Sequence, residues 1–595
     1  MSDALDALRR AGAVDALDER FARAVGTLAG EGREAVLLAA ALVSRQVSAG
    51  HVCLDLAAQP LESGAGDGEA ATGAWPPAGD WRGALEGSPL VGGPKQVTPL
   101  VLHGDRLYLR RYFEHEQGLA RALLRRARPA AEPVDDAVLN EGLDRLFPPP
   151  ADARPDLQRL AARTAVARRF TVISGGPGTG KTSTVVKILA LLVEQSRARG
   201  SRLPRIALLA PTGKAAARLV ESIERAKATL AADADVIEAI PDAAATIHRA
   251  LGTVRGSSTR FRHDADRPLL ADVVLIDEAS MVDLALMARL LEAVPEGARL
   301  ILLGDRDQLA SVEAGAVLGD ICGGAAVAGG VPGQGPPIAR SIVQLTRSWR
   351  YREDSGIGAL ARAVHRGDGA AALAVLGDPR HPDVELLAPR ADGHLSAPLR
   401  ARVVAGYRPY LEAEDPAAAL AAFDAFRVLC AHRRGPHGVE PVNREVAGLL
   451  VEEDLVALRG AHFPGRPVMV TRNDYAVGLF NGDVGLELAG PADSGVRAFF
   501  PGEGGALRAL SPGRLPQHET VWAMSVHKSQ GSEVDEVAVL LPVAPSRVLS
   551  RELLYTAVTR ARERVVVYAT PEIVRYAVEH RVERASGLRD ALWGT

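Results

Sequence analysis

Cysteine is scarce in this chain of 595 residues. Its three cysteines, Cys53, Cys322 and Cys430, lie far apart in the sequence and form no C-x-x-C pair. This spacing argues against a zinc knuckle, an iron–sulfur cluster and a disulfide framework, and it is typical of proteins from a reducing compartment.

An excess of charge of one sign and a long hydrophobic run are also missing. Lys and Arg together number 70 and Asp and Glu number 73, for a formal net charge of −3, so nucleic acid could be bound only in a local basic groove. The first residues carry no basic segment, and the apolar run at 35–43 falls short of the about 20 residues that span a bilayer. We therefore expect a soluble, cytoplasmic protein with no membrane partner.

The length of the chain predicts several domains, because 595 residues are too many for one hydrophobic core. The first part has helical spacing at 5–28 and 35–48, and residues 62–94 are rich in Gly, Ala and Pro, which predicts a surface loop. No catalytic constellation occurs in this part. We therefore expect residues 1–126 to form a small α+β docking domain.

Strand-like and helical segments alternate from residue 156 onward, which is typical of a parallel α/β sheet with ligands at the carboxyl ends of its strands. We expect one α/β lobe at 140–340 and a second at 341–595, separated near a Gly/Ala/Pro-rich stretch at 323–337. Turn signals such as Asn481-Gly482 predict a small β insertion at about 430–515 in the second lobe. The strands expected in the first lobe are 171–174, 206–210, 273–276 and 300–303.

The pattern G-x-x-x-x-G-K-T follows the first of these strands and opens a helix. Phosphate oxygens need several N–H donors close by, glycine lets the backbone approach, and the helix N-terminus adds its positive dipole end. Lys181 is expected to reach the β- and γ-phosphates of ATP, Thr182 to bind Mg²⁺, and the Gln158 amide to read the adenine edge. The expected ATP-binding residues are Gln158, Gly175, Gly176, Pro177, Gly178, Thr179, Gly180, Lys181 and Thr182.

Two adjacent acids end the apolar strand at 273–276. Placing two carboxylates at the end of a buried strand lowers the stability of the fold unless a cation balances their charge. Asp277 is therefore expected to hold Mg²⁺, and Glu278 to orient and deprotonate the attacking water. Gln308, in the pattern G-D-x-x-Q-L after the next strand, is expected to sense the γ-phosphate.

Arginines of the second half complete the expected catalytic set. Arg350 is expected to clamp a phosphate, and Arg560, on a helix with an apolar face, to reach the γ-phosphate across a cleft as an arginine finger. We expect Trp349 to lie in the core, because aromatic residues make up only 4% of the chain and a core needs them. The expected catalytic residues are Lys181, Asp277, Glu278, Gln308, Arg350 and Arg560.

Short polar clusters after several strands predict contacts with a DNA backbone. Hydroxyls, cations and helix N-termini hold phosphates without reading the base sequence. Ordinary helix caps would look the same at 210–216 and 246–249, so that alternative stays open. The expected DNA contacts are Thr212, Lys214, Thr246, His248, Ser525, His527 and Lys528.

These clusters, in this order, resemble the motifs of superfamily 1 helicases over about residues 155–570. Within that superfamily the sequence is similar to the RecD family, the α subunits of exodeoxyribonuclease V (RecBCD). The resemblance implies two RecA-like lobes with ATP between them, and an ATP-driven 5′→3′ helicase that works with RecB- and RecC-like subunits on single-stranded DNA at double-strand ends, in recombinational repair and degradation. The stretches that carry the RecD likeness are 50–56, 106–109, 173–182, 478–483 and 554–561.

The resemblance assigns nuclease activity to the RecB partner, and we find no nuclease-type cluster of carboxylates with a lysine in this sequence. Three alternatives remain: a stand-alone RecD-like helicase, a structural subunit with a dead ATP site, and another P-loop ATPase of the clamp-loader or partition kind. The N-terminal likeness argues against the first and the intact site residues against the second. The Gln308 motif and the cluster at 527–531 argue against the third.

Overall fold

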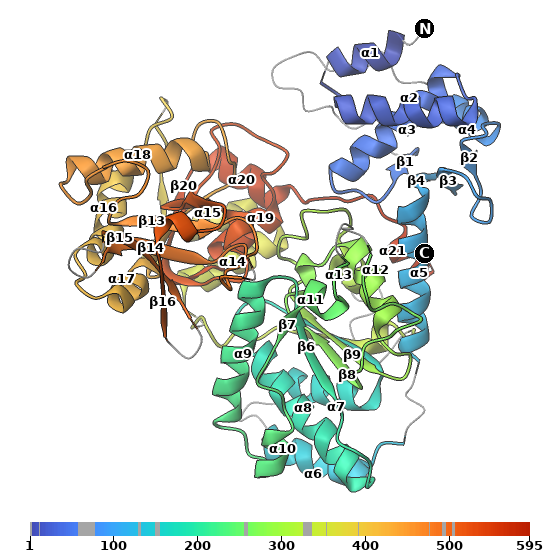
Figure 1. Cartoon of the computed structure of the whole chain (residues 1–595), viewed down its shortest axis with the longest axis horizontal. Helices are drawn as coiled ribbons and strands as arrows, with labels where there is room; N and C mark the ends of the chain where they lie inside the picture. The colour runs from blue at the N-terminus through green and yellow to red at the C-terminus, as the bar shows by residue number, and fades with distance from the viewer. Residues whose placement is uncertain are drawn as a thin grey trace.

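The computed structural model describes residues 3–10, 12–57, 78–128, 133–148, 155–254, 260–324, 336–352, 354–390, 392–474, 476–490, 495–502 and 506–594. Four sheets organise these residues, and two of the four are entirely parallel (Figure 1). The predicted α/β class is therefore confirmed. Among the described helices, none is long and apolar enough to cross a bilayer.

An N-terminal module packs helices against a small sheet of strand order β1-β4-β3-β2. Leu5, Leu38 and Leu107 are among the side chains buried in a core that belongs to the module itself. The elements of the module are α1 (Asp3–Arg10), α2 (Ala16–Ala29), α3 (Glu34–Ser48), β1 (Leu54–Asp55), α4 (Ala78–Glu86), β2 (Val91–Gly92), β3 (Leu100–His103) and β4 (Arg106–Leu109).

The helix expected at 5–28 is in fact two helices, α1 and α2. The Asp18 carboxylate accepts a hydrogen bond of 3.0 Å from the backbone N–H of Asp15, which closes the start of α2 as a new helix. Apolar periodicity continues across the break, which is why the sequence pattern did not reveal it.

The surface loop expected at 62–94 is only partly a loop. Residues 58–77 lie outside the described residues, but the remainder forms α4 and β2. Trp81 and Leu90 are buried in the core of the module. The Gly and Pro residues here therefore lie between a short helix and a short strand and do not prevent either from forming.

The first lobe is built on a parallel sheet of order β10-β5-β9-β8-β6-β7. Its strands are nearly continuous apolar runs, as strands buried on both faces require, and the four expected strands are all present. The elements are α6 (Asp136–Leu146), α7 (Leu157–Ala167), β5 (Phe170–Gly175), α8 (Lys181–Ala198), β6 (Ile206–Ala210), α9 (Gly213–Lys227), α10 (Ala234–Glu238), β7 (Ala245–Thr246), α11 (Ile247–Leu251), β8 (Val273–Ile276), α12 (Leu284–Ala293), β9 (Arg299–Gly304), α13 (Val317–Gly323) and β10 (Ile342–Leu345).

Strand β10 lies beyond the lobe boundary expected at residue 340, yet it completes the first sheet. Ile342 is paired with Val172 of β5, and the two strands run parallel. Most of the Gly/Ala/Pro-rich stretch at 323–337 lies outside the described residues. The first lobe therefore extends through residue 345, and the crossing to the second lobe follows β10.

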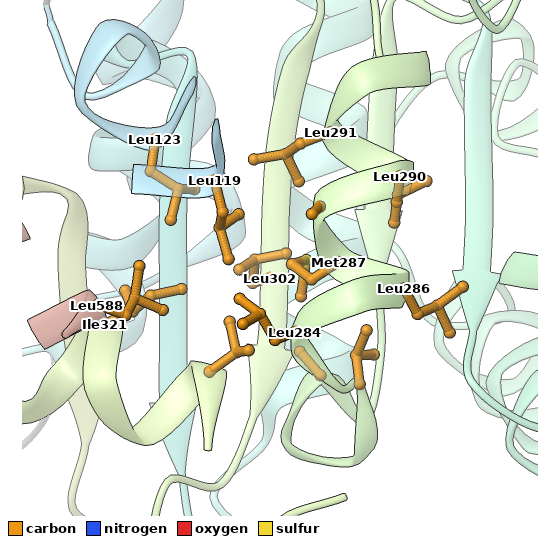
Figure 2. Packing of buried hydrophobic residues seen from close by; sticks show 14 of the residues in the cluster. Leu119, Leu123, Leu284, Leu286, Met287, Leu290, Leu291, Leu302, Ile321 and Leu588 are labelled. Atoms are coloured by element: carbon orange, nitrogen blue, oxygen red, sulfur yellow. The ribbon is translucent and has the colours of Figure 1, made fainter. Parts of the chain in front are cut away.

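Helix α5 (Arg110–Arg126) belongs to the core of the first lobe. Its Leu119 and Leu123 lie in one buried cluster with Met287 of α12 and Leu302 of β9 (Figure 2). The buried Arg126 at its end donates to backbone carbonyls of residues 294–298. The N-terminal module therefore ends before α5, and not at residue 126 as expected.

The second lobe is built on a parallel sheet of order β11-β20-β19-β12-β18. The buried strands β12 and β19 lie at its centre, and helices follow most strands. The elements are α14 (Gly356–Arg366), α15 (Gly369–Leu376), β11 (Val384–Leu387), α16 (Ala397–Leu411), α17 (Pro416–Phe423), β12 (Phe426–Cys430), α18 (Val439–Glu452), β18 (Ala523–Ser525), β19 (Val534–Leu540), α19 (Arg551–Val558), β20 (Ala561–Tyr568) and α20 (Pro571–Glu579).

A separate antiparallel sheet of order β16-β15-β14-β13-β17 is inserted between β12 and β18. Gly482, in the turn between β13 and β14, has a φ of +95°, which accounts for the Asn-Gly signal. The strands are β13 (Arg466–Val470), β14 (Val484–Ala489), β15 (Val496–Pro501), β16 (Leu507–Leu510) and β17 (His518–Thr520).

After α20 the chain returns to the first lobe, where α21 (Leu588–Trp593) lies beside α5 (Figure 1). The Arg584 guanidinium donates to the carbonyl oxygens of Ser311 and Gly315, at 2.6 and 2.9 Å. The buried Glu116 of α5 accepts from the Gly587 N–H at 2.8 Å. This segment therefore ties the end of the second lobe to the first lobe and to α5.

Replacing Leu123 with alanine should lower the free energy of unfolding of the first lobe by about 2–5 kcal/mol, because a fully buried side chain leaves a packed core. Hydrogen exchange of the β5 and β9 amides, followed against urea, measures the change in this multidomain chain. Leu28→Ala is the matched control, because Leu28 is 87% exposed and its loss should cost less than about 0.5 kcal/mol. Unchanged protection in Leu123→Ala would contradict the place of α5 in this core.

Candidate active site

The loop between β5 and α8 has the geometry of a phosphate cradle. Gly178 and Gly180 have φ angles of +73° and +80°, in the left-handed region that side chains disfavour. A Cβ atom on Gly178 would lie 2.3 Å from the Cβ of Arg350, so only glycine permits this approach. The N–H groups of the loop and of the first turn of α8 are therefore the donors offered to an anion.

Lys181, the first residue of α8, folds back over the loop. Its Nζ donates to the carbonyl oxygens of Gly175 at 2.6 Å and Gly176 at 3.1 Å. The Thr179 hydroxyl donates to the same Gly176 carbonyl at 2.8 Å, which tightens the loop. The ammonium group is thus held at the cradle by carbonyl acceptors, for which phosphate oxygens can exchange.

Gln158 lies against the P-loop. Asp156 caps α7, and the Nε2 atom of Gln158 donates to the carbonyl oxygen of Thr179 at 3.0 Å. A Cβ atom on Gly180 would lie 2.4 Å from that Nε2. The amide therefore supports the loop, and its expected reading of the adenine edge stays a prediction.

Asp277 and Glu278 follow directly on β8, next to the P-loop. Glu278 has a φ of +50°, a strained conformation for a non-glycine residue and one that clusters at functional sites. Burial raises the pKa of Asp277, the neighbouring Glu278 carboxylate raises it further, and the Lys181 charge acts against the rise. A divalent cation would relieve this penalty, so the donor set of Asp277 with the Thr182 hydroxyl fits Mg²⁺.

Gln308 of the first lobe and Arg560 of the second lobe are both buried and hydrogen-bonded to each other. The Nη2 of Arg560 donates to the Oε1 of Gln308 at 3.1 Å. The Nε2 of Gln308 in turn donates to the Oδ2 of Asp305 at 3.1 Å, and burial raises the pKa of Asp305 to about 6. A continuous chain of polar contacts therefore runs from the second lobe to the end of β9.

Arg350 lies where the chain crosses between the lobes. The backbone N–H of Trp349 donates to the carbonyl oxygen of Gly178 at 2.7 Å, which holds this crossing segment on the P-loop. The Arg350 guanidinium forms an ion pair with Glu533 of the second lobe. The structure thus brings the P-loop, the acid pair, Gln308, Arg350 and Arg560 to one region between the lobes.

Trp349 is not in the core, contrary to expectation. Its side chain is 62% exposed, and the guanidinium carbon of Arg347 lies 4.0 Å from the ring centroid. The low aromatic content of the whole chain does not predict whether one particular aromatic residue is buried. The position of Trp349 is set by its backbone hydrogen bond to the P-loop. An exposed indole beside a phosphate cradle offers a surface on which a base can stack.

Tyr555 of α19 also lies at this site, although the sequence did not single it out. A Cβ atom on Gly176 would lie 2.7 Å from its hydroxyl oxygen. Burial raises the pKa of Tyr555, and the Asp305 carboxylate raises it further. The residue stood inside the 554–561 motif, but its apolar neighbours made it look like part of the helix core.

Two of the expected DNA contacts in the first lobe are helix caps. The Thr212 hydroxyl accepts from the Ala215 N–H, and the Thr246 hydroxyl accepts from the Arg249 N–H, both at 3.2 Å. His248 is exposed on α11. Each hydroxyl accepts a capping bond and can still donate its own O–H, so each helix start offers this O–H together with its free N–H groups.

Lys214 faces the second lobe and not an open surface. Burial lowers its pKa to about 8, and the nearby Arg218 charge lowers it further, whereas Asp424 and Asp483 act in the opposite direction. A Cβ atom on Gly213 would lie 2.9 Å from Phe480 of the inserted sheet. The first turn of α9 is therefore covered by the second lobe in this arrangement.

The expected DNA contacts of the second lobe lie at the end of β18 and on the short turn that follows it. Lys528 donates to Glu519 at 2.6 Å, so part of its charge is already balanced. Burial lowers the pKa of His527, and the Arg584 charge lowers it further. Ser525 stands at the start of the turn, and its side chain makes no capping bond to the described residues.

Two histidines and a glutamate meet in the inserted sheet, where ligand atoms of His462, Glu487 and His518 lie within 4.8 Å of one another. The fully buried Glu487 already pairs with His462 at 2.7 Å and with Arg466 at 3.4 Å. Because the Arg466 charge balances the carboxylate and repels a cation, we interpret this cluster as a structural ion pair.

Three family profiles match the chain. The AAA domain matches residues 158–314, the N-terminal domain of RecBCD enzyme subunit RecD matches residues 10–108, and the UvrD-like helicase C-terminal domain matches residues 520–568. The RecD profile ends where α5 begins, in agreement with the limit of the N-terminal module.

The RecBCD enzyme subunit RecD of Mycobacterium tuberculosis is 45% identical over 599 residues, which are 99% of this chain and 96% of that protein. The corresponding subunit of Haemophilus influenzae is 34% identical and covers 86% of this chain and 84% of its own length. The ATP-dependent RecD2 DNA helicase of Deinococcus radiodurans is 32% identical, but the match spans only 54% of its length. Among solved structures, a Pif1 helicase from Bacteroides is a distant likeness, with 16% identity over 71% of this chain and a TM-score of 0.37.

Relative to the wild type, Asp305→Asn should gain about 1–3 kcal/mol in free energy of unfolding between pH 4 and pH 8 in the nucleotide-free chain. The folded-state pKa of about 6 lies above the ordinary value of 3.8, so the buried carboxylate costs stability when ionised, and this cost disappears as the pH falls toward 4. Hydrogen exchange of the β9 amides at several pH values measures the gain. A gain that does not depend on pH would contradict this origin.

Asp272→Asn is the control of opposite sign. The hydrogen bond from Arg202 holds the pKa of the Asp272 carboxyl well below its usual range, so the ionised form stabilises the fold. Removing the charge should therefore lower stability at pH 8, and this loss should diminish only as the pH falls below the ordinary range of aspartate.

Proposed function

The chain belongs to the RecD family of RecBCD enzyme subunits, and we propose that it is an ATP-driven DNA helicase acting as the α subunit of an exodeoxyribonuclease V complex with RecB- and RecC-like subunits. It unwinds DNA from double-strand ends for recombinational repair and degradation, moving 5′→3′ on one strand. The observation that carries this proposal is the buried bond between Arg560 and Gln308, which joins the two lobes beside the P-loop.

ATP binds at the cradle of residues 175–182 in this proposal. The loop N–H groups and the start of α8 hold the phosphates, and Lys181 exchanges its carbonyl partners for β- and γ-phosphate oxygens. The base lies between Gln158 and the exposed ring of Trp349, since both are anchored to the backbone of the P-loop.

Magnesium fits the acid pair, because burial raises the pKa of Asp277 and this carboxylate needs a cation to remain ionised. Thr182 and Asp277 would hold the ion, which would neutralise charge on the phosphates. Glu278 accepts the proton of the attacking water. The strained backbone of Glu278 turns its side chain away from the direction that a continued strand would give it.

Hydrolysis is coupled to movement through the contacts between the lobes. Arg560 approaches the γ-phosphate from the second lobe, and Arg350 approaches it from the crossing segment. Gln308 senses the γ-phosphate, and its hydrogen bonds link both lobes to the site. When the phosphate leaves, Arg350 returns to Glu533 and Arg560 to Gln308, and the arrangement of the lobes changes. Repetition of this cycle moves a strand held at α9, at α11 and at the turn after β18.

The alternatives from the sequence are less well supported. A stand-alone RecD2-type helicase matches this chain over only 54% of its own length, and the RecD N-terminal profile covers residues 10–108 here. A dead ATP site conflicts with the complete set of Lys181, Thr182, Asp277, Glu278 and Gln308. A clamp-loader or partition ATPase would not carry the UvrD-like helicase C-terminal match.

An ATPase assay with single-stranded DNA tests the proposed function. Arg560→Ala should slow DNA-stimulated hydrolysis by a factor on the order of 10³, because the γ-phosphate loses its finger, whereas binding of a fluorescent nucleotide should persist. Arg564→Ala is the matched control, since Arg564 is partly exposed on β20 and pairs with Glu385 away from the site. Lys181→Gln should abolish turnover.

Equal loss of binding and hydrolysis in Arg560→Ala would instead mark a structural role, because this guanidinium also bonds to the carbonyl oxygens of Thr556 and Ser532. Arg560→Lys distinguishes the two cases. It keeps a charge but cannot reproduce the three bonds, so it should bind nucleotide and hydrolyse it slowly.

DNA contacts should be mainly with phosphates, because a motor must pass every sequence. Affinity for single strands, measured by fluorescence anisotropy, should fall about 50-fold between 50 and 200 mM salt if about four phosphates are contacted. It should differ little between base sequences. Lys528→Gln should reduce the salt slope by about 0.7. A shallow slope with strong sequence preference would overturn this interpretation.

A further inference from the structure

Helix α9 turns a cation, Arg218, toward the second lobe, and no step above uses it. Lys214, Ala215 and Arg218 share one face of the helix, because residues three and four apart lie above one another. A Cβ atom on Gly531 of the second lobe would lie 3.9 Å from the Cβ of Ala215. The face that carries Arg218 is therefore the face that meets the segment 531–533.

Arg218 has no partner among the described residues, since no hydrogen bond or ion pair of its guanidinium is found there. Burial lowers its pKa, and the acid that acts most strongly against this is Glu533, ahead of Glu278 and Asp424. Arg218 is half-buried, and a guanidinium partly withdrawn from water gains free energy when a carboxylate comes within reach. Glu533, two residues after Gly531, is positioned to do so.

The Oε1 atom of Glu533 is at present engaged by Arg350 in an ion pair, and its Oε2 atom lies 3.7 Å from the Nε of the exposed Arg562. Burial favours its protonation, but the charges of Arg350, Arg218 and Arg560 outweigh burial and hold the pKa of Glu533 below its usual range. Arg350 is also the phosphate clamp of the proposed function. One guanidinium cannot serve both the carboxylate and a phosphate with full geometry.

We propose that Arg218 is a positioning residue that takes Glu533 from Arg350 when ATP draws the lobes together, which releases Arg350 to the γ-phosphate. The proposal rests on the proposed function in treating Arg350 as the phosphate clamp. One ion pair, Glu533 with Arg350, is replaced by two, Glu533 with Arg218 and Arg350 with phosphate. The exchange therefore leaves no guanidinium of this set unpaired.

The position of Arg218 also links this exchange to DNA. Lys214, a proposed phosphate contact, lies one turn before Arg218 on the same face of α9. A strand can reach Lys214 only where Phe480 moves off Gly213, so DNA binding and the exchange both act on the contact between α9 and the second lobe.

Four variants of the full chain test the exchange: Arg218→Gln, Glu533→Gln, the double variant, and Arg225→Gln as the control. Arg225 is exposed near the other end of α9. Affinity for a nonhydrolysable ATP analogue with Mg²⁺, measured without DNA, should fall about 10- to 100-fold in Arg218→Gln, because Arg350 stays with Glu533. It should recover in the double variant, where a neutral amide no longer holds Arg350, and Arg225→Gln should match the wild type.

Recovery in the double variant separates the exchange from damage to the fold, because a helix weakened by loss of Arg218 would stay impaired. Arg218→Lys should lie between wild type and Arg218→Gln. Wild-type affinity in Arg218→Gln, or a loss that the double variant does not restore, overturns the exchange. If the affinity pattern holds but single-stranded DNA does not stimulate wild-type ATPase, the helicase function fails while the exchange stands.

Discussion

The guanidinium of Arg560 is buried at the boundary of the two lobes and donates in three directions, to Thr556, Ser532 and Gln308. Removing such a group from water is costly unless each of its donors is satisfied. Two of these bonds stay within the second lobe and one crosses to the first. The joint between the lobes at the site therefore combines this polar bond with Leu309 of the first lobe, which is buried in the core cluster of the second lobe and is hydrogen-bonded through its backbone to Thr556 and Gln530.

The N-terminal module is connected to this joint through the core of the first lobe. Helix α5 shares a buried cluster with β9. The carboxylate of its Glu116 accepts a hydrogen bond from the backbone N–H of Gly587, in the segment after α20 that returns to the first lobe. Arg584 of the same segment holds the carbonyl oxygens of Ser311 and Gly315, a few residues after Gln308. A partner bound to the module would therefore adjoin a chain of contacts that ends beside Gln308, the proposed sensor of the γ-phosphate.

The parts of the site that sequence reasoning found are those whose signal is contiguous. The P-loop and the acid pair are each a strand followed at once by its polar residues, and parallel strands bring such ends to one edge. The missed features depend on partners distant in the chain. The place of α5 follows from α12, more than 150 residues later, and the exposure of Trp349 follows from a backbone bond to Gly178. No local pattern of apolar residues encodes such pairings.

Lys214 shows how the DNA track and the lobe arrangement depend on each other. The sequence predicts it as a phosphate contact, whereas the structure turns it toward the second lobe, where burial lowers its pKa to about 8. Phe480 covers the adjoining Gly213, so a strand can reach the start of α9 only if the inserted sheet and α9 move apart there. The affinity for DNA and the arrangement of the lobes are then thermodynamically linked. If ATP changes the populations of the lobe arrangements, it also changes the affinity for DNA.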